Sequence, residues 1–178
     1  GSFYDIGSQS AVRKTLERLA IAGVIRRLAP GLYDYPKRHP VLGDLSPNYE
    51  QIGRALAEQG KLRLQPSGAY AANLLRLTEQ VPAKIIFLTD GSSRKVAIGK
   101  QEIILKKTTP KNMAVSRRIT GLVIQALRYL RSSPDMAQHV TRLKKSLDAD
   151  TKKDLAALTP KLPAWMRPVA QQIVEART

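Results

Sequence analysis

Two acidic residues, Asp90 and Glu102, have types and an order that could hold a catalytic metal. Asp90 follows the strand-like run Lys84–Thr89, and Glu102 comes later, which is similar to the Asp and Glu-x-Lys arrangement of metal-dependent nucleases. That arrangement needs a lysine after the glutamate, but Glu102 is followed by Ile103 and Ile104. An Asp-Gly pair after a strand more often forms a turn. A metal-dependent nuclease is therefore the least favoured alternative.

No other residues suggest catalysis or a cofactor. The chain has no Cys, and its two His residues, His39 and His139, are far apart in the sequence, which argues against a Cys- or His-bound metal. Ser67 beside Gly68 has no His and Asp partners at a known spacing, and no glycine-rich loop leads from a strand to a helix. We therefore expect a protein that is not an enzyme and that uses no cofactor and no metal.

Positive charge is the strongest compositional signal. The 178 residues include 30 Lys and Arg against 14 Asp and Glu, a formal net charge of +16. Such a field attracts polyanions, of which nucleic acid is the commonest. There is no signal peptide and no apolar run of about 18 residues, so we expect a cytoplasmic protein that does not enter a membrane. Aromatic residues are only 5% of the chain, which argues against a surface that stacks single-stranded bases.

Residues 8–36 place several of these cations on one helix and one hairpin. Ser8 is a good N-cap, Gly23 can end the helix, and an apolar face recurs at Val12, Leu16 and Leu19. Two strand-like runs, 24–28 and 32–35, then flank a Pro-Gly turn. The pattern is typical of the recognition helix and wing of a winged helix-turn-helix. The alternative is a small helix and hairpin with a solvated basic face.

In the DNA-binding interpretation, the helix enters the major groove and the hairpin follows the phosphates. The residues expected at DNA are Ser10, Arg13, Lys14, Arg18, Arg26, Arg27, Lys37 and Arg38. Arg13 is the best candidate for a bidentate contact with guanine, so its replacement should relax sequence preference. Replacing Arg26 should weaken binding to all DNA alike and reduce the salt dependence by roughly one unit.

The rest of the chain predicts a second domain, so the expected fold class is α+β. Prolines and Gly43 predict a linker over residues 36–43, which divides a winged helix-turn-helix at 1–44 from a C-terminal domain at 45–178. Because Phe3 almost directly precedes the recognition helix, we expect the helices that normally come before it to be missing and the first domain to be truncated.

The C-terminal domain is expected to combine a small antiparallel sheet with a helical C-terminal part. Ser46 is the expected N-cap of a helix that has Pro47 in its first turn and ends near Gly60. The other expected elements are a helix from residue 69, a strand meander over Lys84–Thr89, 95–98 and 102–107, and helices over 117–130, 136–147, Ala149–Leu158 and 164–177.

A second basic segment lies in the middle of this domain. A phosphate or an acidic partner could bind a surface formed by Lys106, Lys107, Lys111, Arg117 and Arg118. The alternative is a sheet edge that lysines protect from aggregation. A protein-interaction module that docks an acidic partner is thus the alternative to DNA binding. Trp165 is expected to be a core residue, with a partner-binding anchor as the alternative.

Five strings of the chain look like those of the AbiEi-type antitoxins of type IV toxin–antitoxin systems. They are S-x-x-A-V-x-x-x-L-x-R-L (8–19), I-R-R-L-A-x-G-L-Y-D-Y-P (25–36), L-Q-P-S-G-A-Y-A-A-N-L-L (64–75), Q-V-P-A-K-I-I-F-L-T-D-G (80–91) and P-A-W-M-R-P (163–168). They resemble in particular a bacterial subgroup with a winged-helix start and a compact C-terminal domain. Members of that subgroup carry a further helical segment before the position of Phe3.

The resemblance implies a transcriptional autorepressor that binds inverted repeats in double-stranded DNA upstream of its own operon. It also implies that the C-terminal domain counters a nucleotidyltransferase-like toxin without forming a tight complex with it, in a system with a role in phage defence. These expectations come from the resemblance alone.

Overall fold

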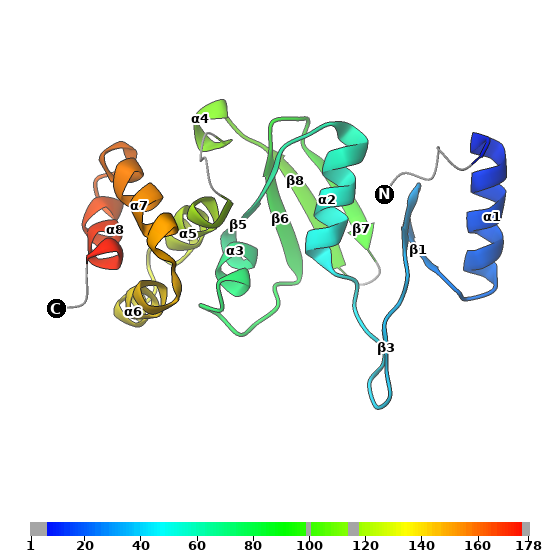
Figure 1. Cartoon of the computed structure of the whole chain (residues 1–178), viewed down its shortest axis with the longest axis horizontal. Coiled ribbons are helices and arrows are strands. Elements are labelled where there is room, and N and C mark those ends of the chain that lie inside the picture. The colour runs from blue at the N-terminus through cyan, green and yellow to red at the C-terminus, as the bar shows by residue number, and fades with distance from the viewer. Residues whose placement is uncertain (1–6, 99–100, 114–117, 176–178) are drawn as a thin grey trace. The chain divides into compact units, whose positions relative to one another are not determined.

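The computed structural model describes residues 7–98, 101–113 and 118–175. Helices and small sheets are both present (Figure 1), which confirms the α+β fold class. The chain forms two compact units, one with the described residues up to Leu62 together with Lys95–Ile103, the other with Arg63–Arg94 and the described residues from Ile104 onward. Helix α2 (Tyr49–Gly60) therefore groups with the N-terminal hairpins, beyond the expected division at residue 44. Separate folding of 1–44 and 45–178 stays a prediction.

The first helix, α1 (Gln9–Ile21), begins and ends as the sequence predicts. The Ser8 hydroxyl accepts a hydrogen bond from the Ala11 N–H at 3.4 Å. At the other end Gly23 has a φ of +70°, and the Val24 N–H reaches back to the Leu19 carbonyl at 3.0 Å. This is a Schellman motif, in which glycine takes the left-handed conformation without steric cost. Its expected apolar face is only half-buried, however, and α1 has no fully buried residue.

Two antiparallel hairpins follow α1, and the sequence predicts only the first. Strands β1 (Arg26–Ala29) and β2 (Leu32–Asp34) form the expected hairpin, with Gly31 at φ +72° in the turn. The expected linker is wrong, because β3 (Arg38–His39) and β4 (Gly43–Asp44) form a second hairpin there. Pro40 lies in its loop, outside the paired strands, so the missing proline N–H removes no bond of the ladder.

The N-cap of α2 is Asn48 and not Ser46. The Asn48 side-chain oxygen accepts hydrogen bonds from the backbone N–H groups of Glu50 at 2.9 Å and Gln51 at 3.2 Å. These are two of the donors that a helix N-terminus leaves unpaired, and an asparagine at the cap satisfies them directly. Helix α2 ends at Gly60, as expected.

The main sheet has the strand order β5-β6-β8-β7. Strands β6 (Lys84–Thr89), β7 (Arg94–Ile98) and β8 (Gln101–Lys107) are where the sequence predicts them, but β8 and not β7 lies beside β6, so the expected meander is wrong. The sequence does not predict β5 (Leu64–Ser67), which pairs antiparallel with β6. Pro66 is tolerated in β5 because an edge strand has one side without a ladder partner. Helix α3 (Gly68–Leu74) follows at once.

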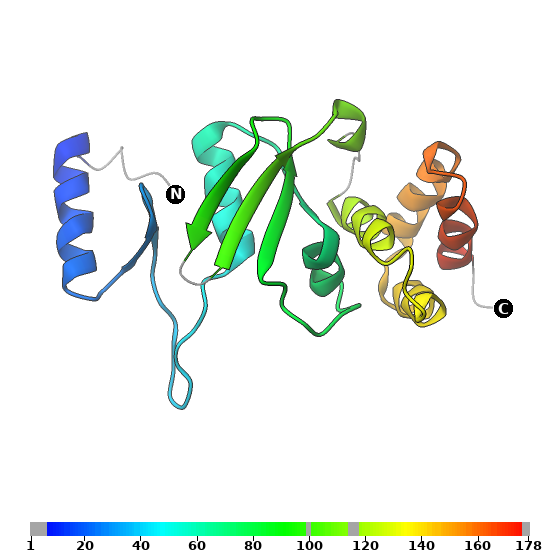
Figure 2. The same cartoon turned by 180° about the vertical axis from the view of Figure 1, so that it is seen from behind.

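The C-terminal part is helical, as Figure 2 shows from behind. Its elements are α4 (Pro110–Met113), α5 (Arg118–Tyr129), α6 (Met136–Ser146), α7 (Ala149–Leu158), a 3-10 turn (Thr159–Lys161) and α8 (Met166–Val174). Among the residues that the structure describes, no helix combines the length and the apolar character needed to cross a membrane.

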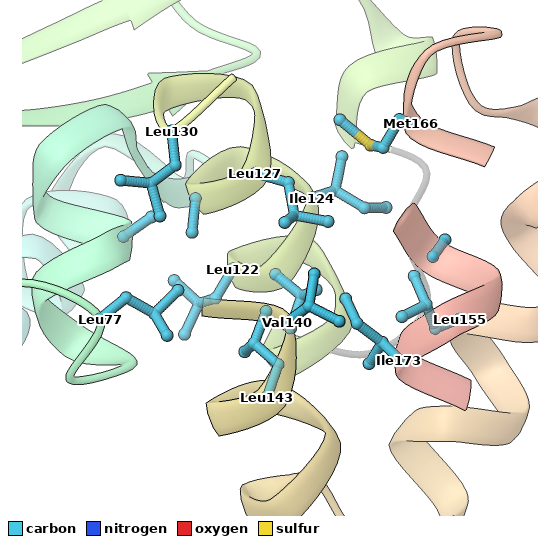
Figure 3. Close-up of a cluster of buried hydrophobic side chains, with 14 of the residues drawn as sticks. Leu77, Leu122, Ile124, Leu127, Leu130, Val140, Leu143, Leu155, Met166 and Ile173 are labelled. Carbon is cyan, nitrogen blue, oxygen red and sulfur yellow. The ribbon is translucent and has the colours of Figure 1, made fainter. Parts of the chain in front are cut away.

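These helices surround a core that α3 helps to complete (Figure 3). Leu127, Leu143 and Leu155 are fully buried in it. Trp165 is partly buried against the same cluster, with the Arg131 guanidinium 5.2 Å from the ring centroid, which favours the core interpretation of Trp165. Residues 120–127 of α5 are buried on every side, whereas Ile119, just before them, is 43% exposed.

Gly121 lets α5 lie directly against the side chain of Gln65 in β5. A Cβ at position 121 would overlap the Gln65 amide, with the Gln65 Cδ at 2.7 Å. We expect Gly121→Ala to destabilise the protein by at most about 1 kcal/mol, because the overlapping atoms are the end of the flexible Gln65 side chain, which can turn aside, and because alanine is the better helix former by about 1 kcal/mol. Urea unfolding measures this loss.

The matched test is Gln65→Ala in the Gly121→Ala background. Removing the amide makes room for the new methyl group, so the double variant should be more stable than Gly121→Ala alone. An unchanged or lower stability of the double variant would contradict this contact between β5 and α5.

Candidate nucleic-acid interface

Helix α1 carries a row of polar side chains on one side and half-buried apolar side chains on the other, although the exposed Ile21 also lies on the polar side. Ser10, Lys14 and Arg18 recur every four residues and thus lie along one side of the helix, where all three are exposed. The half-buried apolar residues, Val12, Leu16 and Leu19, occupy the other side. The Ser10 hydroxyl lies 3.3 Å from that of Ser8. The structure therefore brings three of the predicted DNA-binding residues onto one accessible face.

Each acidic residue between Gly7 and Asp44 is paired with an arginine. There are three such carboxylates, and their pairs are Arg13 with Glu17 at 3.8 Å, Arg26 with Asp34, and Arg38 with Asp44 at 3.0 Å. The second and third pairs join residues directly opposite each other in the β1–β2 and β3–β4 hairpins. In a sheet, such cross-strand pairs of opposite charge stabilise the register.

The ion pairs leave a set of cations free to meet an external anion. Within the described part of the chain these exposed side chains have no carboxylate partner, and they are Lys14, Arg18, Arg27 and Lys37. They come from α1, the β1–β2 hairpin and the segment that follows it. The first unit thus carries four exposed cations whose charge no carboxylate of the described residues offsets, and we call them the α1–hairpin cation set.

Arg26 has a different environment from Arg27. Adjacent residues of a strand point to opposite faces, and here Arg26 is half-buried whereas Arg27 is exposed. Arg26 donates to Asp34 and to the Leu45 carbonyl at 3.2 Å. Burial raises the pKa of the Tyr49 phenol, and the positive charge of Arg26 partly offsets that rise. Arg26 therefore holds the hairpin together, and its phosphate contact stays a prediction.

Arg13 and Arg38 are more open than Arg26. Both side chains are 76% exposed, although each has a carboxylate neighbour. Exposed pairs of this kind are worth at most about 1 kcal/mol, so either arginine can exchange its carboxylate for a phosphate or a base edge. The predicted guanine contact of Arg13 is thus compatible with this geometry and stays a prediction.

The second basic segment is only partly described. Lys106 and Lys107 are exposed at the end of β8, where the Lys107 N–H donates to the Ser93 hydroxyl at 2.9 Å. Arg118 is exposed at the start of α5. Arg117 and the side chain of Lys111 lie outside the described residues. The structure therefore places two lysines together at this strand end, and a binding role for the five residues stays a prediction.

The possible nuclease residues have structural partners. Both carboxylate oxygens of Asp90 accept hydrogen bonds from Arg63, one from its N–H at 2.9 Å and one from its Nε at 2.8 Å. Glu102 forms an ion pair with Lys95 at 3.5 Å. In the described ranges, no three His, Cys, Asp or Glu side chains gather so that they could hold a metal ion. The Asp90 carboxylate instead joins the start of β5 to the end of β6.

This contact predicts a pH dependence. The hydrogen bonds from the side chain and the N–H of Arg63 lower the pKa of Asp90 below its ordinary value of 3.8. Stability from the charged carboxylate is therefore present above pH 3.8 and is lost as the pH falls through the lowered value. We expect Asp90→Asn to lower the melting temperature at neutral pH, and the difference from the wild type to shrink in acid.

Thermal unfolding across this pH range measures the effect, with the exposed residue Glu58 changed to Gln as the control. A difference between Asp90→Asn and the wild type that stays constant into acid would show that Arg63 does not stabilise the charged form of Asp90.

Sequence reasoning missed the pairing of the hairpin carboxylates. A regular two-residue Pro-Gly turn would place Arg27 opposite Asp34, but a register shift between Arg27 and Ala29 brings Arg26 there instead, and no local pattern predicts that shift. It also missed His39, whose ring Nδ1 accepts hydrogen bonds from the N–H groups of Val41 and Leu42. No sequence pattern identifies that contact, because it depends on the loop conformation between β3 and β4.

Comparison with known protein families identifies a family to which the chain is similar. The sequence profile of a family of unknown function, DUF6088, matches residues 1–155. No curated protein and no solved structure matches the chain.

Proposed function

The chain belongs to the DUF6088 family, a family of unknown function, and from that premise we propose that it is a DNA-binding transcriptional repressor of its own operon. The partner is double-stranded operator DNA that contains inverted repeats. In the proposal α1 enters the major groove, and the β1–β2 hairpin contacts the adjacent phosphates. The proposal includes no catalytic step, no cofactor and no metal.

One observation carries this proposal. All three carboxylates of the segment Gly7–Asp44 are neutralised by arginines, and the α1–hairpin cation set is left exposed without a carboxylate partner in the described residues. Lysine and arginine that meet phosphates release condensed counterions, which supplies affinity for any DNA. The regular spacing of Ser10, Lys14 and Arg18 on one helix side adds two cations that can meet phosphates and a hydroxyl that can reach a base edge.

We also propose that the protein is the antitoxin of a type IV toxin–antitoxin system in the cytoplasm. The support is the resemblance of its five sequence strings to AbiEi-type antitoxins. In this role the C-terminal helices would counter a nucleotidyltransferase-like toxin without a tight complex. Expressing the toxin of the same operon, with and without this protein, tests the antitoxin role through cell growth.

A second candidate function is a module that docks an acidic protein. It is favoured by Lys106 and Lys107, which are both exposed at the end of β8. Such a module would bind its partner in a salt-sensitive manner, and Lys106→Gln with Lys107→Gln would weaken that binding without changing DNA affinity.

A titration of the whole protein on DNA tests the repressor proposal. The DNA from upstream of its own operon is compared with a scrambled duplex at two salt concentrations. We expect a preference of at least about a thousandfold for the upstream DNA. Equal and steeply salt-dependent binding to both duplexes would overturn sequence-specific repression.

A further inference from the structure

The β3–β4 hairpin carries an exposed apolar tip. Val41 is 85% exposed and Leu42 is 72% exposed, and the two are adjacent at the end of the hairpin. The hairpin extends away from α2 and from the β1–β2 hairpin in both views (Figures 1 and 2). Two large apolar side chains in contact with water at such a projecting point are a candidate contact surface.

The tip is held in one conformation by its own hydrogen bonds. The His39 ring accepts from the Val41 N–H at 3.2 Å and from the Leu42 N–H at 3.3 Å. At the base, the Leu45 N–H donates to the Lys37 carbonyl at 2.8 Å, and Arg38 pairs with Asp44 at 3.0 Å. The two apolar side chains are therefore presented on a preorganised support, which reduces the entropy lost when they bind.

The charge beside the tip indicates the kind of partner. At the base of the hairpin, Lys37 is exposed without a carboxylate partner in the described residues, Arg38 is 76% exposed although it pairs with Asp44, and the chain as a whole is strongly positive. A narrow apolar tip with cations behind it matches the chemistry of a minor-groove wedge, in which apolar side chains enter between base pairs while Lys and Arg meet the phosphates. Such wedges unstack a base step and bend the duplex.

We propose that Val41 and Leu42 insert into the minor groove of the bound DNA and bend it. This inference rests on the proposed DNA binding and adds a second contact to it, separate from α1 and the β1–β2 hairpin. The hairpin would then contribute to specificity through the deformability of the DNA, since pyrimidine–purine steps unstack most easily.

The test compares the wild type with the double variant Val41→Ser and Leu42→Ser on duplexes from upstream of the operon. Each duplex carries one 2-aminopurine, which becomes fluorescent on unstacking, and a dye pair at its ends, which reports bending by energy transfer. We expect the wild type to unstack one step and bend the DNA, and the variant to lose both signals. Affinity should fall roughly tenfold to a hundredfold, with the salt dependence unchanged.

The control replaces two exposed apolar residues elsewhere, Val81→Ser and Tyr129→Ser, and should bind and bend like the wild type. Equal melting temperatures show that each variant folds. If the wild type prefers the upstream DNA but the Val41 and Leu42 variant bends it equally, the wedge is wrong and the repressor stands. If the wild type shows no such preference, the repressor proposal itself fails, and the wedge fails with it.

If the tip binds a second copy of the chain or a membrane in place of DNA, the measurements give different results. If the tip served self-association, sedimentation would show a wild-type dimer that the variant loses, with no unstacking of DNA. If it served an anionic membrane, phosphatidylserine vesicles would capture the wild type and not the variant. Either result, without DNA bending, overturns the wedge.

Discussion

Replacing Lys14 and Arg18 together by glutamine is expected to reduce the salt dependence of DNA binding by about two units. Both side chains are exposed on one side of α1 and have no carboxylate partner among the described residues. Each lost phosphate contact removes about 0.9 from the slope of log affinity against log salt concentration. Affinity at low salt should therefore fall for every DNA sequence. Fluorescence anisotropy titrations over a series of salt concentrations measure the slope.

The matched control removes the same amount of positive charge from a different part of the chain. Lys145→Gln with Lys153→Gln removes two exposed cations from α6 and α7. This control variant should retain the wild-type slope to within about half a unit, because long-range attraction alone is screened beyond about 10 Å in 0.1 M salt. If both double variants reduced the slope equally, the charge of the whole chain and not α1 would account for the binding.

Leu127→Ala is expected to cost about 2–5 kcal/mol of unfolding free energy. Leu127 is 0% exposed at the centre of the C-terminal core, within a stretch of α5 that is buried on every side. Truncating such a residue removes its transfer free energy and leaves a cavity that the neighbours fill only in part. Because small domains are stable by only about 5–15 kcal/mol, this one change removes a large fraction of the total. Urea unfolding followed by circular dichroism gives the value.

Lys153→Ala on the exposed side of α7 serves as the comparison for Leu127→Ala. A surface change away from caps and ion pairs should alter stability by no more than about 0.5 kcal/mol. A loss below about 1 kcal/mol for Leu127→Ala would be inconsistent with the packing of α3, α5 and α7 shown in Figure 3.

Local signals are enough to predict many of the elements. Residues 84–89 form a β-branched and aromatic run between Pro82 and an Asp-Gly pair, and β6 has those bounds. Helix α7 also begins and ends where its sequence predicts, since the Asp148 carboxylate caps it by accepting from the Thr151 N–H at 2.6 Å. Where nearby residues form the cap or the turn, the sequence is enough to predict where the helix or strand begins and ends.

Elements that depend on distant partners could not be predicted. Strand β5 contains Pro66, which argues against a strand, yet pairing with β6 makes it an edge strand. The order of the main sheet likewise depends on which strand lies beside β6, and local patterns carry no information about that choice. The prolines around the β3–β4 hairpin predict a linker, whereas the contacts of the His39 ring that order its loop leave no mark in the sequence.

The candidate nucleic-acid interface also has features that local sequence predicts and features that depend on distant contacts. The helical period alone places Ser10, Lys14 and Arg18 on one side of α1. Which arginines are neutralised depends on the register of two hairpins, so sequence reasoning gives Arg26 and Arg27 the same role. The partner of Asp90 lies 27 residues earlier in the chain, and no spacing rule connects the two.

Hydrogen exchange measured by mass spectrometry, on the whole protein with and without double-stranded DNA from upstream of its operon, tests the central claim most directly. The claim is that the segment from α1 to β4 contacts DNA. We expect DNA to slow amide exchange across residues 9–44, with residues 84–98 and the helices α5 to α8 unchanged. Protection confined to β6, β7 and the end of β8, with residues 9–44 unaffected, would contradict the claim and place the polyanion on the second basic segment.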